Sequence, residues 1–154
     1  TWQRQTSGTS SILTSVCAVD ENNATVVGLS SILRTRNGGL TWTPQDSGAL
    51  GGLYSVSCVD TSTAYASGNG IFRTTDGGSQ WMVQGGASYV RAIHMVNATI
   101  GTAVGGGGQI LRTTTGGMYG WQRQISGTNE MLRSVAFADA NLGIAVGDSG
   151  VIRT

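Results

Sequence analysis

The side chains of this 154-residue chain that could perform acid–base chemistry are eight acidic residues and one histidine. Glycoside hydrolysis generally needs two carboxylates, or a tyrosine with a carboxylate, placed across one bond. Four acidic residues instead lie at predicted turns of a sequence repeat of about forty residues: Asp20, Asp60, Asp76 and Asp139. The other four are scattered through predicted loops: Glu21, Asp46, Glu130 and Asp148. We therefore expect no catalytic residues and interpret the chain as a protein that is not an enzyme.

His94 occupies a repeat position that small residues hold in the other units. A hydrogen-bonded core residue is the expected role, because no nucleophile and carboxylate accompany it and no His, Cys and Asp cluster has metal-ligand spacing. The run Gly105–Gly108 is predicted to join two strands and to open no helix, so it lacks the amide geometry that binds phosphate. The sequence thus predicts neither a metal nor a cofactor.

Arginine and tyrosine are the residues most suited to binding. One position early in the first strand of each unit differs among the four repeats: Thr14, Tyr54, Arg91 and Arg133. Because an asymmetric ligand needs a site that breaks the repeat, Tyr54, Arg91 and Arg133 are candidates for holding an acidic peptide or an acidic or sulfated sugar. The preceding loops add Glu130 and Tyr89 on the same face. The alternative is that these side chains only line a solvated channel mouth.

A second set of arginines recurs on the third strand of every unit: Arg34, Arg73, Arg112 and Arg153. A residue that is repeated four times is explained by the fold, so we expect these arginines to pack their stems and to pair locally. The formal net charge is only +1, and all nine basic residues are arginine. A generic binder of nucleic acid or of an acidic membrane surface needs many more cations on one face.

Neither membrane insertion nor a cysteine framework is indicated. No apolar run approaches the length of a spanning helix, and there is no charged-then-apolar signal segment. Cys17 and Cys58 lie one repeat apart on predicted inner strands of neighbouring units. Packed sheets lie about 10 Å apart, whereas bridged Cβ atoms lie near 3.8 Å. We therefore expect two buried free thiols. Two glycosylation sequons permit a secreted protein, and an extracellular or other non-cytosolic compartment is the expected location.

Tryptophans recur at intervals of 39 or 40 residues and define the repeat that must position these groups: Trp2, Trp42, Trp81 and Trp121. Each unit contains four short β-type runs separated by glycine and polar turns, with no helical spacing. A four-stranded unit of this length is a propeller blade with the tryptophan on the outermost strand. The predicted fold is an all-β propeller with four antiparallel blades, at about 1–42, 43–81, 82–121 and 122–154. Val16, Val56, Ile93 and Val135 should be buried on the innermost strands.

The segment Thr74–Trp81 matches the Asp-box pattern S/T-x-D-x-G-x-x-W. The unit resembles the Asp-box (BNR-type) repeats of the photosystem II assembly and stability factor family and, more distantly, those of bacterial neuraminidases. Two other copies depart from the pattern, with Asn37 or Thr115 at the Asp position, and Thr115 should make the weaker cap. The box residues are Thr35, Asn37, Gly39 and Trp42; Thr74, Asp76, Gly78 and Trp81; and Thr113, Thr115, Gly117 and Trp121.

The resemblance implies a scaffold that contacts other proteins, and in the neuraminidases the boxes lie away from the active site. We therefore expect a non-catalytic propeller that binds a protein or glycan partner. Two alternatives stay open: a fragment of a sialidase-like enzyme, or a repeat unit of an extracellular fibre or surface assembly. The fourth box is interrupted between Thr154 and Thr1. The array is therefore expected to be part of a larger propeller, to pair with a second copy, or to close through Trp2–Gln5.

Overall fold

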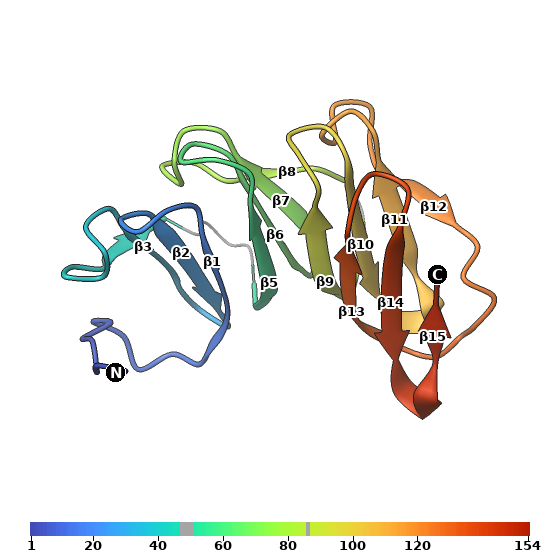
Figure 1. The fold of residues 1–154 in the computed structure, drawn as a ribbon, viewed down its shortest axis with the longest axis horizontal. Helices are drawn as coiled ribbons and strands as arrows, with labels where there is room; N and C mark the ends of the chain where they lie inside the picture. Colours follow the sequence, from blue (N-terminus) through green and yellow to red (C-terminus); the bar gives the residue numbers. More distant parts are fainter. Residues whose placement is uncertain (47–50, 86) are drawn as a thin grey trace.

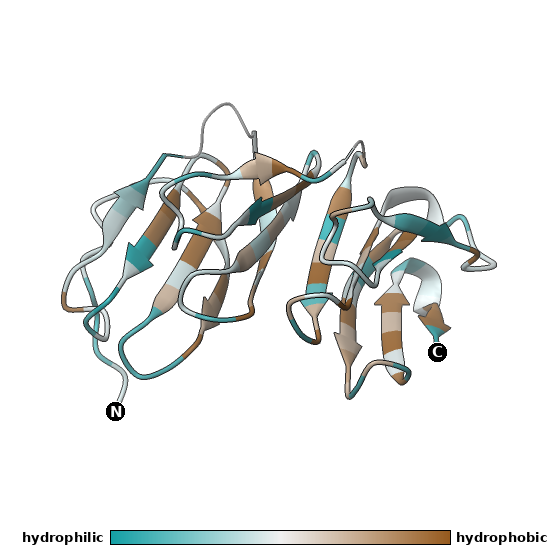
Figure 2. Cartoon of the chain, turned by 90° about the horizontal axis from the view of Figure 1, so that it is seen from above, coloured by the Kyte–Doolittle hydropathy of each residue, from teal (hydrophilic) through white to brown (hydrophobic). Residues whose placement is uncertain are grey.

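The computed structural model describes residues 1–46, 51–85 and 87–154, and these residues form four antiparallel sheets. The sheets stand side by side in an open arc with the two chain termini at opposite ends (Figure 1). Most of their strands are short β-branched or apolar runs, while two of the outermost strands are polar and the loops are polar or rich in glycine (Figure 2). Within the described residues, no helix is long and apolar enough to cross a membrane.

Each sheet is one blade whose strands follow one another in chain order. Blade 1 comprises β1 (Leu13–Ala18), β2 (Ala24–Gly28), β3 (Ile32–Thr35) and β4 (Thr43–Gln45). Blade 2 comprises β5 (Leu53–Cys58), β6 (Ala64–Gly68), β7 (Ile71–Thr74) and β8 (Met82–Val83). Blade 3 comprises β9 (Val90–Met95), β10 (Gly101–Gly105), β11 (Ile110–Thr113) and β12 (Gln122–Gln124). Blade 4 comprises β13 (Leu132–Phe137), β14 (Gly143–Gly147) and β15 (Ile152–Arg153).

The fourth blade is the exception to the predicted four-stranded unit. Trp42, Trp81 and Trp121 each lie next to the start of the outermost strand of a blade, as predicted. Trp2 is fully exposed, and the segment around it is not in a strand. Blade 4 accordingly has three strands within the described part of the chain.

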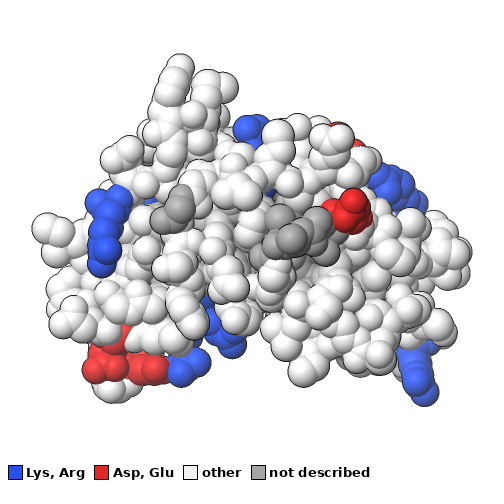
Figure 3. All heavy atoms as spheres, turned by 180° about the vertical axis from the view of Figure 1, so that it is seen from behind, with Lys and Arg blue, Asp and Glu red and all other residues white. Residues whose placement is uncertain are grey.

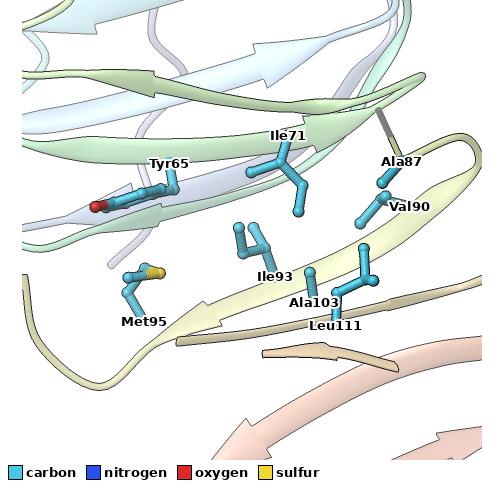
Figure 4. Close-up of a cluster of buried hydrophobic side chains, with 8 residues drawn as sticks. All are labelled: Tyr65, Ile71, Ala87, Val90, Ile93, Met95, Ala103 and Leu111. Atoms are coloured by element: carbon cyan, nitrogen blue, oxygen red, sulfur yellow. The ribbon is translucent and has the colours of Figure 1, made fainter. Parts of the chain in front are cut away.

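The hydrophobic core lies between the blades. Between blades 2 and 3, Tyr65 and Ile71 face Val90 and Ile93 (Figure 4), and Trp121 packs against the rim of this cluster. A second cluster, which includes Val56, joins blades 1 and 2, and a third joins blades 3 and 4. The sheets therefore stabilise one another in pairs, and an end blade has one uncovered face.

Serine hydroxyls bridge the inner strands of neighbouring blades. The amide of Val56 donates to Oγ of Ser15 at 3.2 Å, and the amide of Ile93 donates to Oγ of Ser55 at 3.3 Å. Ser57 accepts from the amide of Met95 at 3.0 Å. The serine side chain is short, so its hydroxyl reaches the backbone of the next blade only because the inner strands run close together. These hydrogen bonds satisfy backbone donors that the blade's own second strand does not pair.

The expectation of two free thiols was wrong: Cys17 and Cys58 form a disulfide, with their Cα atoms 5.7 Å apart. Both residues are only half-buried. The general spacing of packed sheets does not apply here, because blades converge toward the propeller axis and their inner strands lie closest. The disulfide therefore links β1 of blade 1 to β5 of blade 2.

The predicted turn aspartates accept backbone hydrogen bonds, as expected. Oδ1 of Asp60 accepts from the amides of Ser62 and Thr63, each at 2.7 Å, and Asp20 and Asp139 make the same pair of bonds in their blades. In blade 3 the side chain of Asn97 takes this role. Backbone hydrogen bonds hold the pKa of Asp60 below its ordinary value.

The box turns share one hydrogen-bond pattern. The amide of Gly78 donates to Oγ1 of Thr74 at 2.9 Å, and the amide of Gln80 donates to Oδ1 of Asp76 at 3.0 Å. Blade 1 repeats both bonds with Thr35 and Asn37. In blade 3 the bond to Thr115 lengthens to 3.4 Å, as predicted for the weaker cap. Glycines with φ near +70° and +90° complete these turns.

Two of the four third-strand arginines, Arg34 and Arg112, pair with the next blade. Arg73 instead lies over the ring of Tyr65 in its own blade, and Arg153 donates to the carbonyls of Ser126 and Gly127 before β13. Arg34 is buried and donates to the carbonyl of Thr61, in the first turn of blade 2. Arg112 donates to the carbonyl of Ala140 in blade 4. Between blades 2 and 3 the hydroxyl of Tyr65 makes the equivalent contact, to the carbonyl of Ala98 at 3.3 Å. These side chains therefore join blades.

Asp60 provides a test of the turn hydrogen bonds. The pKa of Asp60 is lowered in the folded state, so its carboxylate contributes to the free energy of unfolding. This contribution is complete above the ordinary carboxyl pKa of about 3.8 and is lost as the pH falls through the folded-state pKa. We predict that Asp60→Asn keeps the turn at neutral pH, as Asn97 does, but weakens the acid dependence of the free energy of unfolding.

The control is Asp60→Ala, which should lower stability at neutral pH because both acceptor bonds are lost, and should approach the wild-type stability in acid. Urea unfolding at several pH values measures all three proteins. An Asp60→Asn variant with the wild-type acid dependence would contradict this account of Asp60.

Candidate functional site

Each inner strand carries a β-bulge at the position that the sequence singles out. The pairing of β5 with β6 passes from Leu53–Gly68 to Ser55–Ser67, so Tyr54 has no partner residue. The other three inner strands shift at the corresponding place. The bulged residues are Thr14, Tyr54, Arg91 and Arg133. Because a bulge re-aims a side chain out of the sheet pattern, the fold frees these positions from blade packing.

A glycine stands opposite each bulge, and the close approach of the backbone requires it. A Cβ atom at Gly105 would lie 2.0 Å from the carbonyl oxygen of Tyr89, and one at Gly68 would lie 2.1 Å from that of Gly52. Gly28 and Gly147 are equally constrained. These four glycines end the second run of each repeat in the sequence. They are the signal from which the bulges could have been predicted.

Tyr54 and Arg91 come together on adjacent inner strands. The guanidinium carbon of Arg91 lies 4.8 Å from the ring centroid of Tyr54, which is a cation–π contact. Both residues are half-buried. The stack presents a flat, positively charged surface next to the propeller axis, built from blades 2 and 3. Such a surface suits a carboxylate or another planar acidic group.

Arg133 has a partner that the sequence analysis did not identify. Its guanidinium forms an ion pair with Asp148, and its Nη2 donates to Oδ2 of Asp148 at 3.1 Å. The hydrogen bonds from Arg133 hold the pKa of Asp148 below its ordinary value. Both side chains are exposed, so solvent screens the pair. Asp148 begins the turn after β14. This turn brings Asp148 next to the bulge at the start of β13.

The other candidate residues have different surroundings. Thr14 donates its hydroxyl to the carbonyl of Leu53 at 2.8 Å and so joins blades. Tyr89 is exposed and adopts a positive φ of 57° just before β9. Glu130 is exposed in the loop before β13, where its carbonyl accepts from the amide of Gly108 at 2.9 Å. The structure therefore brings Tyr54 and Arg91 into contact and pairs Arg133 with Asp148.

His94 lies away from this group, near the other end of β9. It is half-buried, and its ring faces Phe137 of blade 4 with centroids 6.2 Å apart. Burial lowers its pKa. His94 thus packs between two blades. The glycine run forms a single 3₁₀ turn, Gly106–Gly108, that joins β10 to β11 as predicted.

Charge is sparse and mixed on the molecular surface. The face opposite to that of Figure 1 is mainly uncharged, with a few isolated basic side chains and one place, at the lower left, where acidic and basic side chains lie together (Figure 3). Among the described residues, no three His, Cys, Asp or Glu side chains are grouped so that they could hold a metal ion. A local contact such as the Tyr54–Arg91 stack is therefore a better candidate for recognising a partner than the electrostatic field of the whole surface.

Comparison with models of protein families and with characterised proteins gives no match. Several solved structures share the fold. YCF48 bound to a D1 peptide has 22% identity and a TM-score of 0.75 over 91% of this chain and 49% of that chain. YCF48 from Cyanidioschyzon merolae has 21% identity and a TM-score of 0.72 over 92% and 52%. An ancestral GH74 enzyme has 19% identity and a TM-score of 0.73 over 94% and 23%.

These similarities confirm the predicted fold class: the chain is an all-β propeller with an open arc of blades. It spans about half the length of the YCF48 structures that it matches. At this level of identity the similarity shows the fold alone. It does not indicate what the bulged residues do in this chain.

The glycines opposite the bulges allow a direct test of how the site is built. We predict that Gly105→Ala lowers the free energy of unfolding by about 1–3 kcal/mol, because its methyl group would overlap the carbonyl of Tyr89. Gly106→Ala is the matched control, since its Cβ would lie 3.5 Å from Cβ of Tyr89, an ordinary contact. Denaturant unfolding compares the two variants. Equal stability would contradict the close approach at the bulge.

Proposed function

We propose that this chain is a partner-binding propeller whose site is the face carrying the four bulges, and that the partner is an acidic segment of another protein. The observation that supports this most directly is the Tyr54–Arg91 stack at 4.8 Å. It sits at the bulge positions, where side chains leave the regular sheet pattern and where the first three blades carry three different residues. Tyrosine supplies an apolar surface and arginine a planar donor fork, a combination that is enriched where proteins bind.

The position of Arg133 refines this proposal. Its ion pair with Asp148 is exposed and worth little to stability, so an incoming carboxylate can replace Asp148 at small cost. Arg91 then makes the primary contact, and Arg133 contributes when Asp148 is displaced. Glu130 disfavours a purely anionic ligand on the blade 4 side. An extended peptide with one or two carboxylates therefore fits better than a uniform polyanion.

The similar structures support a binding role in a limited way. One of them, YCF48, is bound to a peptide, and this chain matches 49% of that chain, which supports peptide binding as a role for this fold. The resemblance of the repeats to those of the photosystem II assembly and stability factor family points in the same direction. We propose that the present repeats are of this Asp-box (BNR) type, because the box turns share one hydrogen-bond pattern.

The acidic residues support binding over hydrolysis. Asp20, Asp60, Asp76 and Asp139 accept hydrogen bonds from turn amides, and Asp148 pairs with Arg133. These carboxylates are thus engaged in holding turns or an arginine. The disulfide favours an oxidising compartment, so we propose a location outside the cytosol.

The test is binding of a synthetic glycine–serine peptide that carries two glutamates, the diglutamate peptide, with the same peptide carrying two glutamines as the neutral peptide and a heparin oligosaccharide as the glycan probe. We predict that Arg91→Ala together with Arg133→Ala weakens binding of the diglutamate peptide by about tenfold or more, since a shielded charged contact contributes about 1.5–3 kcal/mol. Isothermal titration calorimetry measures the affinity. The melting temperature should change little, because Arg133 is exposed and Arg91 is half-buried on the rim.

Arg123→Ala is the matched control for Arg91→Ala alone, because each removes one positive charge and Arg123 lies on the exposed outer strand β12. Its affinity should equal that of the wild-type protein. Binding of the diglutamate peptide that survives the double substitution, or that Arg123→Ala weakens as much as Arg91→Ala alone, would refute the proposed site. Preference for heparin over the diglutamate peptide would identify a glycan partner instead.

A further inference from the structure

A cavity of about 260 Å³ lies at the junction of blades 2 and 3, apart from the proposed peptide site. Both blades have four strands, and a further blade lies beyond each of them (Figure 1). Tyr54 and Arg91 lie on the inner strands β5 and β9, whereas the cavity is lined from β7, β11 and the residues next to β8 and β12. It is therefore farther from the propeller axis. Its lining includes Ile71, Gln84, Gln109, Leu111, Gly120 and Trp121.

Two side chains distinguish this junction from that of blades 1 and 2. Leu111 of blade 3 takes the place of Phe72 in blade 2. Two positions earlier, Gln109 takes the place of Gly70. The ring of Phe72 reaches Gly70, since a Cβ atom there would lie 3.2 Å from its Cζ. Leu111 is shorter and lies at the end of the core cluster near Val90 (Figure 4). Blade 3 therefore has a smaller side chain where blade 2 has a ring, and a carboxamide beside it.

The third box turn is also longer at this junction. Thr113–Trp121 contains one residue more than Thr74–Trp81. Gly120, just before the tryptophan, lines the cavity and has a positive φ of 89°. The extra residue, the exchanged ring and the added carboxamide thus occur at one place. Because residues that recur in every blade are explained by the fold, three departures around one cavity indicate a local role.

Two polar atoms of the lining have no partner. Oε1 of Gln109 and Nε1 of Trp121 are buried and, within the described part of the chain, make no hydrogen bond. The carboxamide of Gln84 lies beside the indole: a Cβ atom at Gly117 would be 2.6 Å from Oε1 of Gln84 and 3.1 Å from Nε1 of Trp121. Nε1 of Trp81 is unpartnered as well, so the acceptor of Gln109 is the atom peculiar to this junction. Because buried polar atoms are nearly always hydrogen-bonded, the cavity presents an acceptor and a donor to a ligand.

None of the described residues that line the cavity is charged. An ionised ligand would lose its hydration there without gaining an opposite charge, which is costly. Ile71 and Leu111 supply apolar surface, and the indole of Trp121 is apolar with one polar edge. The cavity therefore suits a neutral ligand with an apolar side and several groups that form hydrogen bonds.

We infer that this cavity binds one residue of a neutral sugar. A hydroxyl group donates and accepts hydrogen bonds, so the hydroxyls of a sugar can pair with Oε1 of Gln109 and with Nε1 of Trp121. The carbon-bound hydrogens of the ring then contact the apolar lining. Pockets for drug-sized ligands begin at about 300 Å³, so about 260 Å³ limits the occupant to one sugar ring. A free sugar and a residue of a glycan chain share this chemistry, and neither depends on the proposed acidic peptide.

Isothermal titration calorimetry with the methyl glycosides of glucose, galactose and mannose provides the test. We expect at least one to bind with a dissociation constant of about 1 mM, which is ordinary for a ligand of this size. The cationic amino sugar and the anionic uronic acid that correspond to it should bind at least about tenfold more weakly. A disaccharide of the same sugar distinguishes the two sources: tighter binding than the methyl glycoside indicates a glycan chain, and weaker binding a free sugar.

Substitutions connect this binding to the cavity. Gln109→Ala should raise the dissociation constant about three- to tenfold, because one hydrogen bond is lost. Gln122→Ala is the matched control, since Gln122 is exposed on β12 and does not line the cavity. Leu111→Phe combined with Gln109→Gly gives blade 3 the residues of blade 2, and filling the cavity should raise the dissociation constant at least about tenfold. Because blade 2 accommodates Phe72 and Gly70 together, the unfolding midpoint of this variant should change little.

No binding of any of the three methyl glycosides would overturn the inference, and so would binding that Gln122→Ala weakens as much as Gln109→Ala. N-Acetylglycinamide, which has amide groups but no hydroxyl, is the probe for a peptide occupant. Tighter binding of this amide than of every glycoside would identify a peptide group as the ligand and would refute the sugar. Charged sugars that bind as tightly as the neutral one would contradict selection by an uncharged lining.

Discussion

The close approach of the inner strands is the constraint on which the rest of the structure depends. Serine hydroxyls on one inner strand accept hydrogen bonds from backbone amides of the next, which holds neighbouring blades at a fixed separation and register. The same approach brings Cys17 within bonding distance of Cys58. It also sets the hydrophobic side chains of facing blades against one another, so that burial and hydrogen bonding reinforce the same geometry.

The bulges follow from this arrangement and link it to the proposed site. Each inner strand must lie close to the axis, yet its first residues must return from a loop on the face that carries the bulges. A bulge at one residue, opposite a glycine, accommodates the change of direction. The bulged side chain thereby leaves the regular sheet pattern, and the residue at this position differs among the first three blades. The Tyr54–Arg91 stack and the Arg133–Asp148 pair both involve such positions.

Periodicity made much of the fold predictable from sequence. Tryptophan spacing and four β-type runs per unit gave the all-β propeller, and turn chemistry gave the roles of Asp60 and the box residues. The disulfide was not predictable, because it depends on how far apart inner strands lie, a distance that no repeat encodes. The partner of Arg133 was missed for a similar reason: Asp148 comes near it only when the turn after β14 folds back to the bulge. For the bulges a signal was present, in the glycine that ends the second run of every repeat.

Hydrogen–deuterium exchange at the amides of Ile93 and Met95 tests the role of the inner strands most directly. These amides point toward the neighbouring blade, where Ser55 and Ser57 accept their hydrogen bonds. We expect strong protection in the wild-type protein and faster exchange at Ile93 in Ser55→Ala and at Met95 in Ser57→Ala, each without effect on the other site. Exchange at the rate of exposed loops in the wild-type protein would contradict the bridging of inner strands by serine.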